Sequence, residues 1–149
     1  MIMTKTFIHE KAFVDKEVKL GEGCSVWPGA SVRSDEGEIV IGKNTSVQDN
    51  VVIHGRGVVI GDNVTVGHGA IIHGSKIGSN VLIGMGAIVL NGCEIGDWSI
   101  IAAGALLTEG TVVDKGTVMM GIPAKPSRKT EDSDKKYITH ACKAYLDKV

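Results

Sequence analysis

Residues 47–83 read VQDNVVIHGRGVVIGDNVTVGHGAIIHGSKIGSNVLI and contain three of the five histidines of the chain. Aliphatic residues recur in this stretch at a spacing close to six. They are Val47, Ile53, Ile60, Val66, Ile72, Ile77 and Ile83. A period of six is a multiple of the strand period and does not fit the 3.6-residue period of a helix. Each hexad therefore predicts a short strand and a turn, and three of them close one triangular coil. The pattern is typical of a parallel β-helix of hexapeptide repeats.

The same period continues on both sides of this stretch and defines nineteen faces, or about six coils. The remaining inward-pointing corner residues are Ile8, Val14, Leu20, Val26, Val32, Ile41, Val89, Ile95, Ile101, Leu107, Val113 and Met119. The six-residue spacing is interrupted three times: three residues are inserted before Ile41, one is inserted before Ile60, and one is missing before Ile77. All three irregularities flank the histidines, and functional groups are commonly placed at such breaks in a repeat.

The C-terminal part of the chain departs from the hexad pattern. We expect residues 1–122 to form the all-β helix domain and residues 123–149 to form a connector and a C-terminal α-helix. Ile138, Ala141, Tyr145 and Val149 have helical spacing and predict a helix over roughly 133–149. A helix this short is marginal alone, so we expect it to lie against the prism or a neighbouring subunit.

Composition narrows the possible functions. The 149 residues suit one domain, and 16 basic residues nearly balance 17 acidic ones, which argues against a nucleic-acid partner. The sequence contains no pattern of a leader peptide or of a membrane span, so we expect a soluble, cytoplasmic protein with no membrane partner. Its three cysteines, Cys24, Cys93 and Cys142, have no CxxC spacing, and the first two fall on inward positions. Buried, reduced thiols are the expectation.

The coil register predicts which polar residues stack on one another. Arg33, His54 and His73 each follow a corner residue directly and are three faces apart, so they form one column. Asp49 and His68 each lie two places after a corner and form a second column. The columns lie on adjoining corners, and their side chains diverge within one prism. If prisms associate about a three-fold axis, the first column of one subunit can face the second column of the next. Three imidazoles would then meet, a ligand set that suits Zn²⁺ and leaves a fourth position open.

Three motifs carry a resemblance to a known family. They are RSDEG at 33–37, VQDNVVIH at 47–54 and GHGAIIHG at 67–74. Over about residues 8–125 the chain resembles the γ-class carbonic anhydrases, members of the left-handed β-helix hexapeptide superfamily. The resemblance implies a homotrimer with three interfacial metal sites, whose ligands are His54, His68 and His73. Zn²⁺ is the expected metal, and three histidines also accept Fe²⁺ or Co²⁺.

The resemblance also implies roles for other residues. Arg33 would pair with Asp49 across the interface, while Gln48 and Asp35 would orient solvent at the metal or support the interface. Glu36 matches an acidic residue near the site in some members, and Tyr145 matches a tail tyrosine that reaches it.

One departure from the family pattern concerns proton transfer. The best characterised type of member has a long acidic loop with a proton-carrying glutamate. Here only Gly55, Arg56 and Gly57 follow His54 before the next strand, so Glu36 becomes the candidate carrier or the shuttle is absent.

The predicted activity is the reversible hydration of carbon dioxide to bicarbonate, with the metal supplying hydroxide at neutral pH. Two other functions remain open. A hexapeptide acyltransferase or CoA thioesterase would use a lone histidine as general base, although the longest insertion here is only three residues. A non-catalytic metal-binding or assembly subunit would keep the trimer and the metal without hydration.

Overall fold

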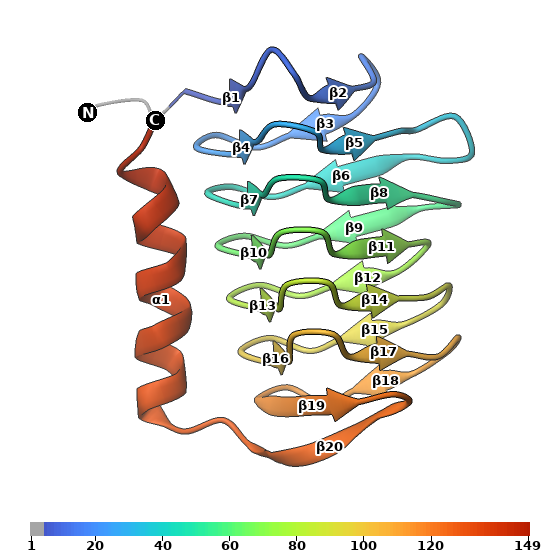
Figure 1. Cartoon of the computed structure of the whole chain (residues 1–149), viewed down its shortest axis with the longest axis vertical. Helices are drawn as coiled ribbons and strands as arrows, with labels where there is room; N and C mark the ends of the chain where they lie inside the picture. Colours follow the sequence, from blue (N-terminus) through green and yellow to red (C-terminus); the bar gives the residue numbers. More distant parts are fainter. Residues whose placement is uncertain (1–4) are drawn as a thin grey trace.

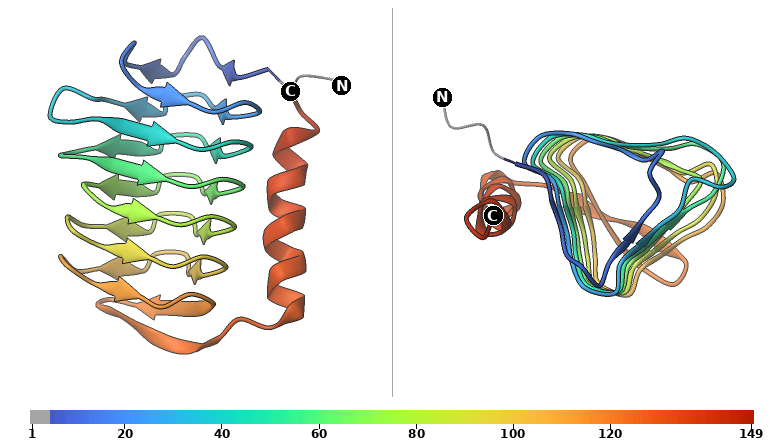
Figure 2. Two further views of the ribbon diagram at one scale, coloured as in Figure 1. Left: turned by 180° about the vertical axis from the view of Figure 1, so that it is seen from behind. Right: turned by 90° about the horizontal axis from the view of Figure 1, so that it is seen from above.

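The hexads of the sequence fold into a triangular prism of stacked coils with one helix beside it (Figure 1). The computed structural model describes residues 5–149. The prism is a left-handed parallel β-helix of about six coils, and the view from above in Figure 2 shows its triangular section. Each face of the prism is one sheet, in which each strand from β1 (Phe7–Ile8) to β16 (Ile100–Ile101) lies beside the strand one coil further along the chain.

The three sheets have the following strands. The first sheet contains β1 (Phe7–Ile8), β4 (Ser25–Val26), β7 (Ser46–Val47), β10 (Thr65–Val66), β13 (Leu82–Ile83), β16 (Ile100–Ile101), β19 (Thr117–Gly121) and β20 (Ala124–Lys129). The second contains β2 (Phe13–Val14), β5 (Ser31–Val32), β8 (Val52–His54), β11 (Ile71–His73), β14 (Ile88–Val89) and β17 (Leu106–Leu107). The third contains β3 (Lys19–Leu20), β6 (Ile39–Ile41), β9 (Val58–Ile60), β12 (Lys76–Ile77), β15 (Glu94–Ile95) and β18 (Val112–Val113).

The core is the column of corner residues inside the prism. Corner aliphatics from Val26 to Leu107 are at most 3% exposed, and the inward cysteines Cys24 and Cys93 are buried and free, as predicted. Ile8 differs, with 47% exposure, because it lies in the first coil and no further coil covers it. Burial raises the pKa of both cysteine thiols, so they remain protonated at neutral pH.

Polar turns hold the corner between the third and first sheets. Asn44, Asn63 and Asn80 all adopt positive φ angles of 55–58°, a conformation that asparagine tolerates better than other residues with side chains. Their amides form a ladder, because Asn44 donates to Asn63 and Asn63 donates to Asn80, each over 3.2 Å. The ladder satisfies side-chain polar groups from one coil to the next.

Helix α1 (Asp132–Leu146) runs along the first sheet, parallel to the stack of coils (Figures 1 and 2). It buries Ile138 and Cys142, and the Cys142 thiol donates to the Asn44 carbonyl over 3.3 Å. The helix starts one residue before the predicted range and ends before Val149. Strand β20 was not predicted; it lies within the proline-containing connector and pairs antiparallel with β19. Among residues 5–149, no helix is both long and apolar enough to cross a bilayer.

Candidate metal centre

The first predicted column forms at the corner where the second sheet ends. His54 and His73 are the last residues of β8 and β11, and they are direct cross-strand partners. Arg33 follows β5, and its backbone N–H donates to the Ile53 carbonyl over 3.0 Å. The register predicted from hexad counting is therefore confirmed for all three residues.

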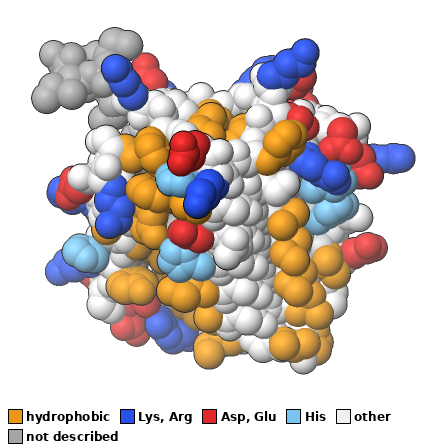
Figure 3. Space-filling model, turned by 45° about the horizontal axis from the view of Figure 1, so that its top comes forward, with side chains coloured by type: hydrophobic (Ala, Val, Ile, Leu, Met, Phe, Trp, Pro, Cys, Tyr) orange, Lys and Arg blue, Asp and Glu red, His pale blue; other side chains and the backbone are white. Residues whose placement is uncertain are grey.

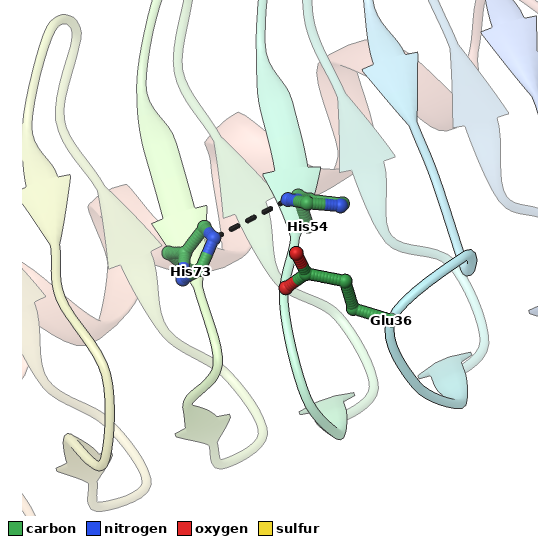
Figure 4. Close-up of side chains that lie close together, drawn as sticks. All are labelled: Glu36, His54 and His73. Atoms are coloured by element: carbon green, nitrogen blue, oxygen red, sulfur yellow. Dashed lines mark hydrogen bonds between the residues drawn. The ribbon is translucent and has the colours of Figure 1, made fainter.

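The two imidazoles of this column turn ring nitrogens toward each other (Figure 4). Nδ1 of His54 lies 3.3 Å from Nε2 of His73. Two nitrogens bound to one tetrahedral Zn²⁺ at roughly 2.0–2.1 Å each are separated by about 3.3 Å. The spacing and chemistry of this pair therefore fit two ligands of a single metal ion.

A carboxylate completes this group within one chain. Ligand atoms of Glu36, His54 and His73 all lie within 4.8 Å of one another, and Glu36 points toward the two rings (Figure 4). A cleft of about 390 Å³ opens beside them, lined by Glu36, Arg56, His73, Gly74, Asn91 and Gly92. Glu36 is exposed, so its carboxylate lies near the histidine pair and is also open to solvent.

The three-residue insertion before Ile41 positions Glu36. The insertion lengthens the loop between β5 and β6, and the carboxylate of Asp15 accepts the backbone N–H of Ser34 over 2.8 Å at the start of that loop. A Cβ on Gly37 would lie 2.7 Å from the backbone nitrogen of Gly57. The inserted loop thus stacks closely on the turn after His54, which requires glycine at this point.

Arg33 and Asp35 both contact the outer nitrogen of His54. Nε2 of His54 lies 2.9 Å from Nη2 of Arg33 and 3.2 Å from Oδ1 of Asp35. Because a guanidinium only donates and a carboxylate only accepts, the two neighbours favour opposite tautomers of the ring. In the tautomer that donates to Asp35, the Nδ1 lone pair of His54 faces His73, as a metal ligand requires.

The second predicted column forms at the adjoining corner, after β7 and β10. The pairing of Val47 with Val66 places Asp49 next to His68, and Nδ1 of His68 lies 3.1 Å from Oδ1 of Asp49. When Nδ1 donates to this carboxylate, the Nε2 lone pair of His68 remains available. The side chains of His68 and Asp49 are 43% and 42% exposed, so a neighbouring molecule can reach them.

Gln48 and Tyr145 lie with His68 around a cleft between α1 and the first sheet. The cleft has a volume of about 420 Å³, and its other walls include Leu82, Met85, Ile100 and Tyr137. The Tyr145 ring packs edge-on against Trp27 with centroids 5.3 Å apart. Burial, and to a smaller extent the charge of Asp49, raise the pKa of Tyr145. The tail tyrosine is therefore held beside the second column as a protonated phenol.

Each predicted site residue thus belongs to one of two groups. The first group is Arg33, Asp35, Glu36, His54 and His73, and the second is Gln48, Asp49, His68 and Tyr145. Within one chain Arg33 contacts Asp35 and His54, whereas Asp49 contacts His68. The predicted pair between Arg33 and Asp49 of different subunits stays a prediction. Figure 3 shows basic, acidic and histidine side chains interspersed with apolar ones on the face that it draws.

One residue beside the first group was not predicted. The side-chain oxygen of Asn91 lies 2.5 Å from Nδ1 of His73. Asn91 is two places after the corner residue Val89, which pairs with Ile72. The first column reaches Leu90 one coil beyond His73, so counting along that column does not reveal Asn91.

Comparison with known proteins identifies relatives of the chain. Residues 74–109 match the family model described as bacterial transferase hexapeptide (six repeats), and residues 38–74 match the model described as hexapeptide repeat of succinyl-transferase. Gamma carbonic anhydrase 2, mitochondrial, of Arabidopsis thaliana is 37% identical over 95% of the chain, and the chain spans only 54% of that protein.

Two further relatives match over most of their own length. Carnitine operon protein CaiE of Escherichia coli K12 is 34% identical over 96% of this chain and 74% of that protein. A crystal structure of a hexapeptide transferase family protein from Anaplasma phagocytophilum superposes with a TM-score of 0.84 at 33% identity. That superposition covers 95% of this chain and 89% of the other.

Proposed function

Since the chain belongs to the hexapeptide-repeat superfamily that includes the gamma carbonic anhydrases, we propose that it hydrates carbon dioxide reversibly at a metal site shared between subunits of a homotrimer. The observation that carries the proposal is the facing pair of ring nitrogens on His54 and His73, 3.3 Å apart. A solvent-exposed carboxylate beside such a pair provides the acid–base group that a hydration reaction also needs.

His54 and His73 of one subunit and His68 of the next would hold the metal, Zn²⁺ first and Fe²⁺ or Co²⁺ as substitutes. A metal bound there would lower the pKa of water to about 7 and so supply hydroxide at neutral pH. The division between subunits is supported by the two separate corners that hold the ligands, and by the 43% exposure of His68. In the assembly, Arg33 of one subunit would pair with Asp49 of the next.

The other residues of the two groups would bind and move solvent. Glu36 would carry protons between the site and the cleft beside it, which opens to solvent. Gln48 and Tyr145 would orient carbon dioxide or bicarbonate from the subunit that contributes His68, because they lie around the same cleft. Asp35 would accept the Nε2 hydrogen of His54 and so fix the tautomer that binds metal.

Two other functions compete with hydration. The family models and the Anaplasma structure carry transferase in their names, which supports an acyltransferase or CoA thioesterase with a lone histidine as general base. Against it, the paired nitrogens of His54 and His73 have no role in a one-histidine mechanism. A non-catalytic metal-binding subunit would retain metal without hydration, so assays of both activities on one metal-loaded sample separate the three functions.

The proposal is tested first at the ligand pair. Changing His73 to Ala should remove bound metal and hydration together. His140→Ala, in an exposed position on α1, is the matched control and should change neither. Hydration that survives in metal-free His73→Ala would contradict the proposal.

A further inference from the structure

Asn91 contacts the ring nitrogen of His73 that does not face His54. Its side-chain carbonyl oxygen lies 2.5 Å from Nδ1 of His73. A carbonyl oxygen only accepts hydrogen bonds, so the hydrogen of the neutral ring is on Nδ1. The lone pair is then on Nε2, the nitrogen that lies 3.3 Å from Nδ1 of His54. Asn91 thus selects the tautomer whose free nitrogen faces the rest of the cluster.

Two glycines fix the position of the same ring. A Cβ on Gly55 would lie 2.8 Å from Nδ1 of His73 and 2.9 Å from Cε1, so the ring packs directly on the backbone of the preceding coil. A Cβ on Gly74 would lie 2.5 Å from Oδ1 of Asn91. The His73 ring therefore packs between Gly55 and Asn91. Asn91 in turn requires glycine at position 74.

We propose that Asn91 is a positioning residue for His73, which it holds in the metal-binding tautomer and orientation through the Nδ1 hydrogen bond. The inference rests on the proposed metal site. Metal-binding histidines commonly donate their second ring nitrogen to such an acceptor. The same relation recurs in this chain, since Asp49 accepts from Nδ1 of His68 and Asp35 lies 3.2 Å from Nε2 of His54. Asn91 is the uncharged acceptor among these three, since Asp49 and Asp35 are carboxylates.

The metal-affinity test compares three variants with the wild-type protein by competition with a chelator for Co²⁺ and Zn²⁺. Asn91→Ala should bind metal about 10- to 100-fold more weakly, the usual effect of losing such an acceptor. Asn91→Asp should restore wild-type affinity, because a carboxylate accepts the same hydrogen bond. Glu109→Ala is the matched control, since Glu109 is exposed and holds the position of Asn91 one coil further on. Unchanged affinity in Asn91→Ala, or a loss as large in Glu109→Ala, would overturn the proposal.

A second measurement needs neither metal nor activity. Long-range ¹H–¹⁵N correlation spectra of the metal-free protein at about pH 8, where an ordinary imidazole is neutral, report the tautomer of each ring. The His73 signals, assigned by their absence in His73→Gln, should show the hydrogen on Nδ1 in the wild type and a mixture of tautomers in Asn91→Ala. A wild-type ring with its hydrogen on Nε2 would overturn the proposal. If hydration activity is absent while these results hold, the proposed reaction fails and the role of Asn91 stands.

Discussion

Nδ1 of His54 lies 3.3 Å from Nε2 of His73, and the two residues are direct partners on neighbouring parallel strands. The parallel register, with strands about 4.8 Å apart, brings the two rings together without any loop. The third predicted ligand, His68, is on another corner of the prism, after β10, and does not belong to the cluster of Glu36, His54 and His73. A site with three histidines therefore requires a second copy of the chain.

The shared site predicts complementation between inactive variants. His68→Ala and His73→Ala should each lack hydration as homotrimers. Co-expression should restore it, because an interface formed by His73 from one variant and His68 from the other is intact. In a random equal mixture about a quarter of the interfaces are of this kind in a closed ring of three.

The control for complementation uses two variants with defects in the same column. His54→Ala mixed with His73→Ala gives no interface with both imidazoles, so hydration should stay absent. If the first mixture also stays inactive while its trimers form, the ligands are not divided between subunits.

Glu36 is expected to move protons without being required for metal binding. Glu36→Gln should keep its metal, while turnover in dilute buffer falls by about 10²-fold and recovers when imidazole buffer is added. Glu38→Gln is the matched control, because Glu38 belongs to the same loop and instead pairs with Lys19 over 3.1 Å. Loss of metal from Glu36→Gln would make Glu36 a ligand, and unchanged turnover would give it no part in the reaction.

The packing of His73 against Gly55 can be tested with a paired substitution. Gly55 and Gly57 both have positive φ angles, 106° and 74°, so alanine at either should destabilise the fold by about 1–2 kcal/mol. A Cβ at Gly57 meets nothing within 4 Å, whereas one at Gly55 lies 2.8 Å from both the backbone nitrogen of Gly74 and Nδ1 of His73, so Gly55→Ala should destabilise the fold more. Metal affinity measured by chelator competition should therefore fall in Gly55→Ala only. Equal affinities in the two variants would contradict this packing argument.

The start of α1 predicts a pH dependence of stability. Two hydrogen bonds from Arg128, of 2.6 and 2.9 Å, and one from the Glu131 backbone lower the pKa of Asp134 from 3.8 to about 2. The pKa of Asp134 is lower in the folded state than in the unfolded state, so the ionised carboxylate stabilises the fold. This stabilisation is complete above about pH 4 and is lost between about pH 4 and pH 2. Urea unfolding should show a stability difference between wild type and Asp134→Asn that shrinks over this range.

The control for this measurement is Lys143→Gln, which breaks an exposed pair with Asp147 elsewhere on the helix. If the free energy of unfolding of the wild type exceeds that of Asp134→Asn by as much at pH 2 as at pH 5, the lowered pKa of Asp134 does not stabilise the fold.

Hexad counting predicted the prism and the columns because a β-helix repeats one local rule, and residues three faces apart must stack. The corner positions and the alignment of Arg33, His54 and His73 follow from that rule alone. The same rule does not apply after Met119, and β20 was missed because its antiparallel pairing with β19 has no period to detect. Ile8 is exposed because it lies at the open end of the stack. The hexad pattern is the same at the end of the stack as in its middle, so it does not predict this exposure.

Side-chain partners were harder to predict than positions. Counting places Asp49 in the column of His68, but it does not show that the carboxylate contacts Nδ1 of that ring. Glu36 reaches the histidine pair through the conformation of an inserted loop, which the repeat does not determine. Asn91 contacts His73 from two places after its corner, by a diagonal contact that a search along single columns overlooks.

We propose above all that metal bound at the His54–His73 pair hydrates carbon dioxide. The most direct test is stopped-flow hydration on anaerobically purified protein, with metal content measured on the same sample and the zinc, cobalt and iron forms compared. Hydration should rise in proportion to metal occupancy and disappear on chelation. A fully metallated trimer with no hydration in any of the three forms would contradict the proposal.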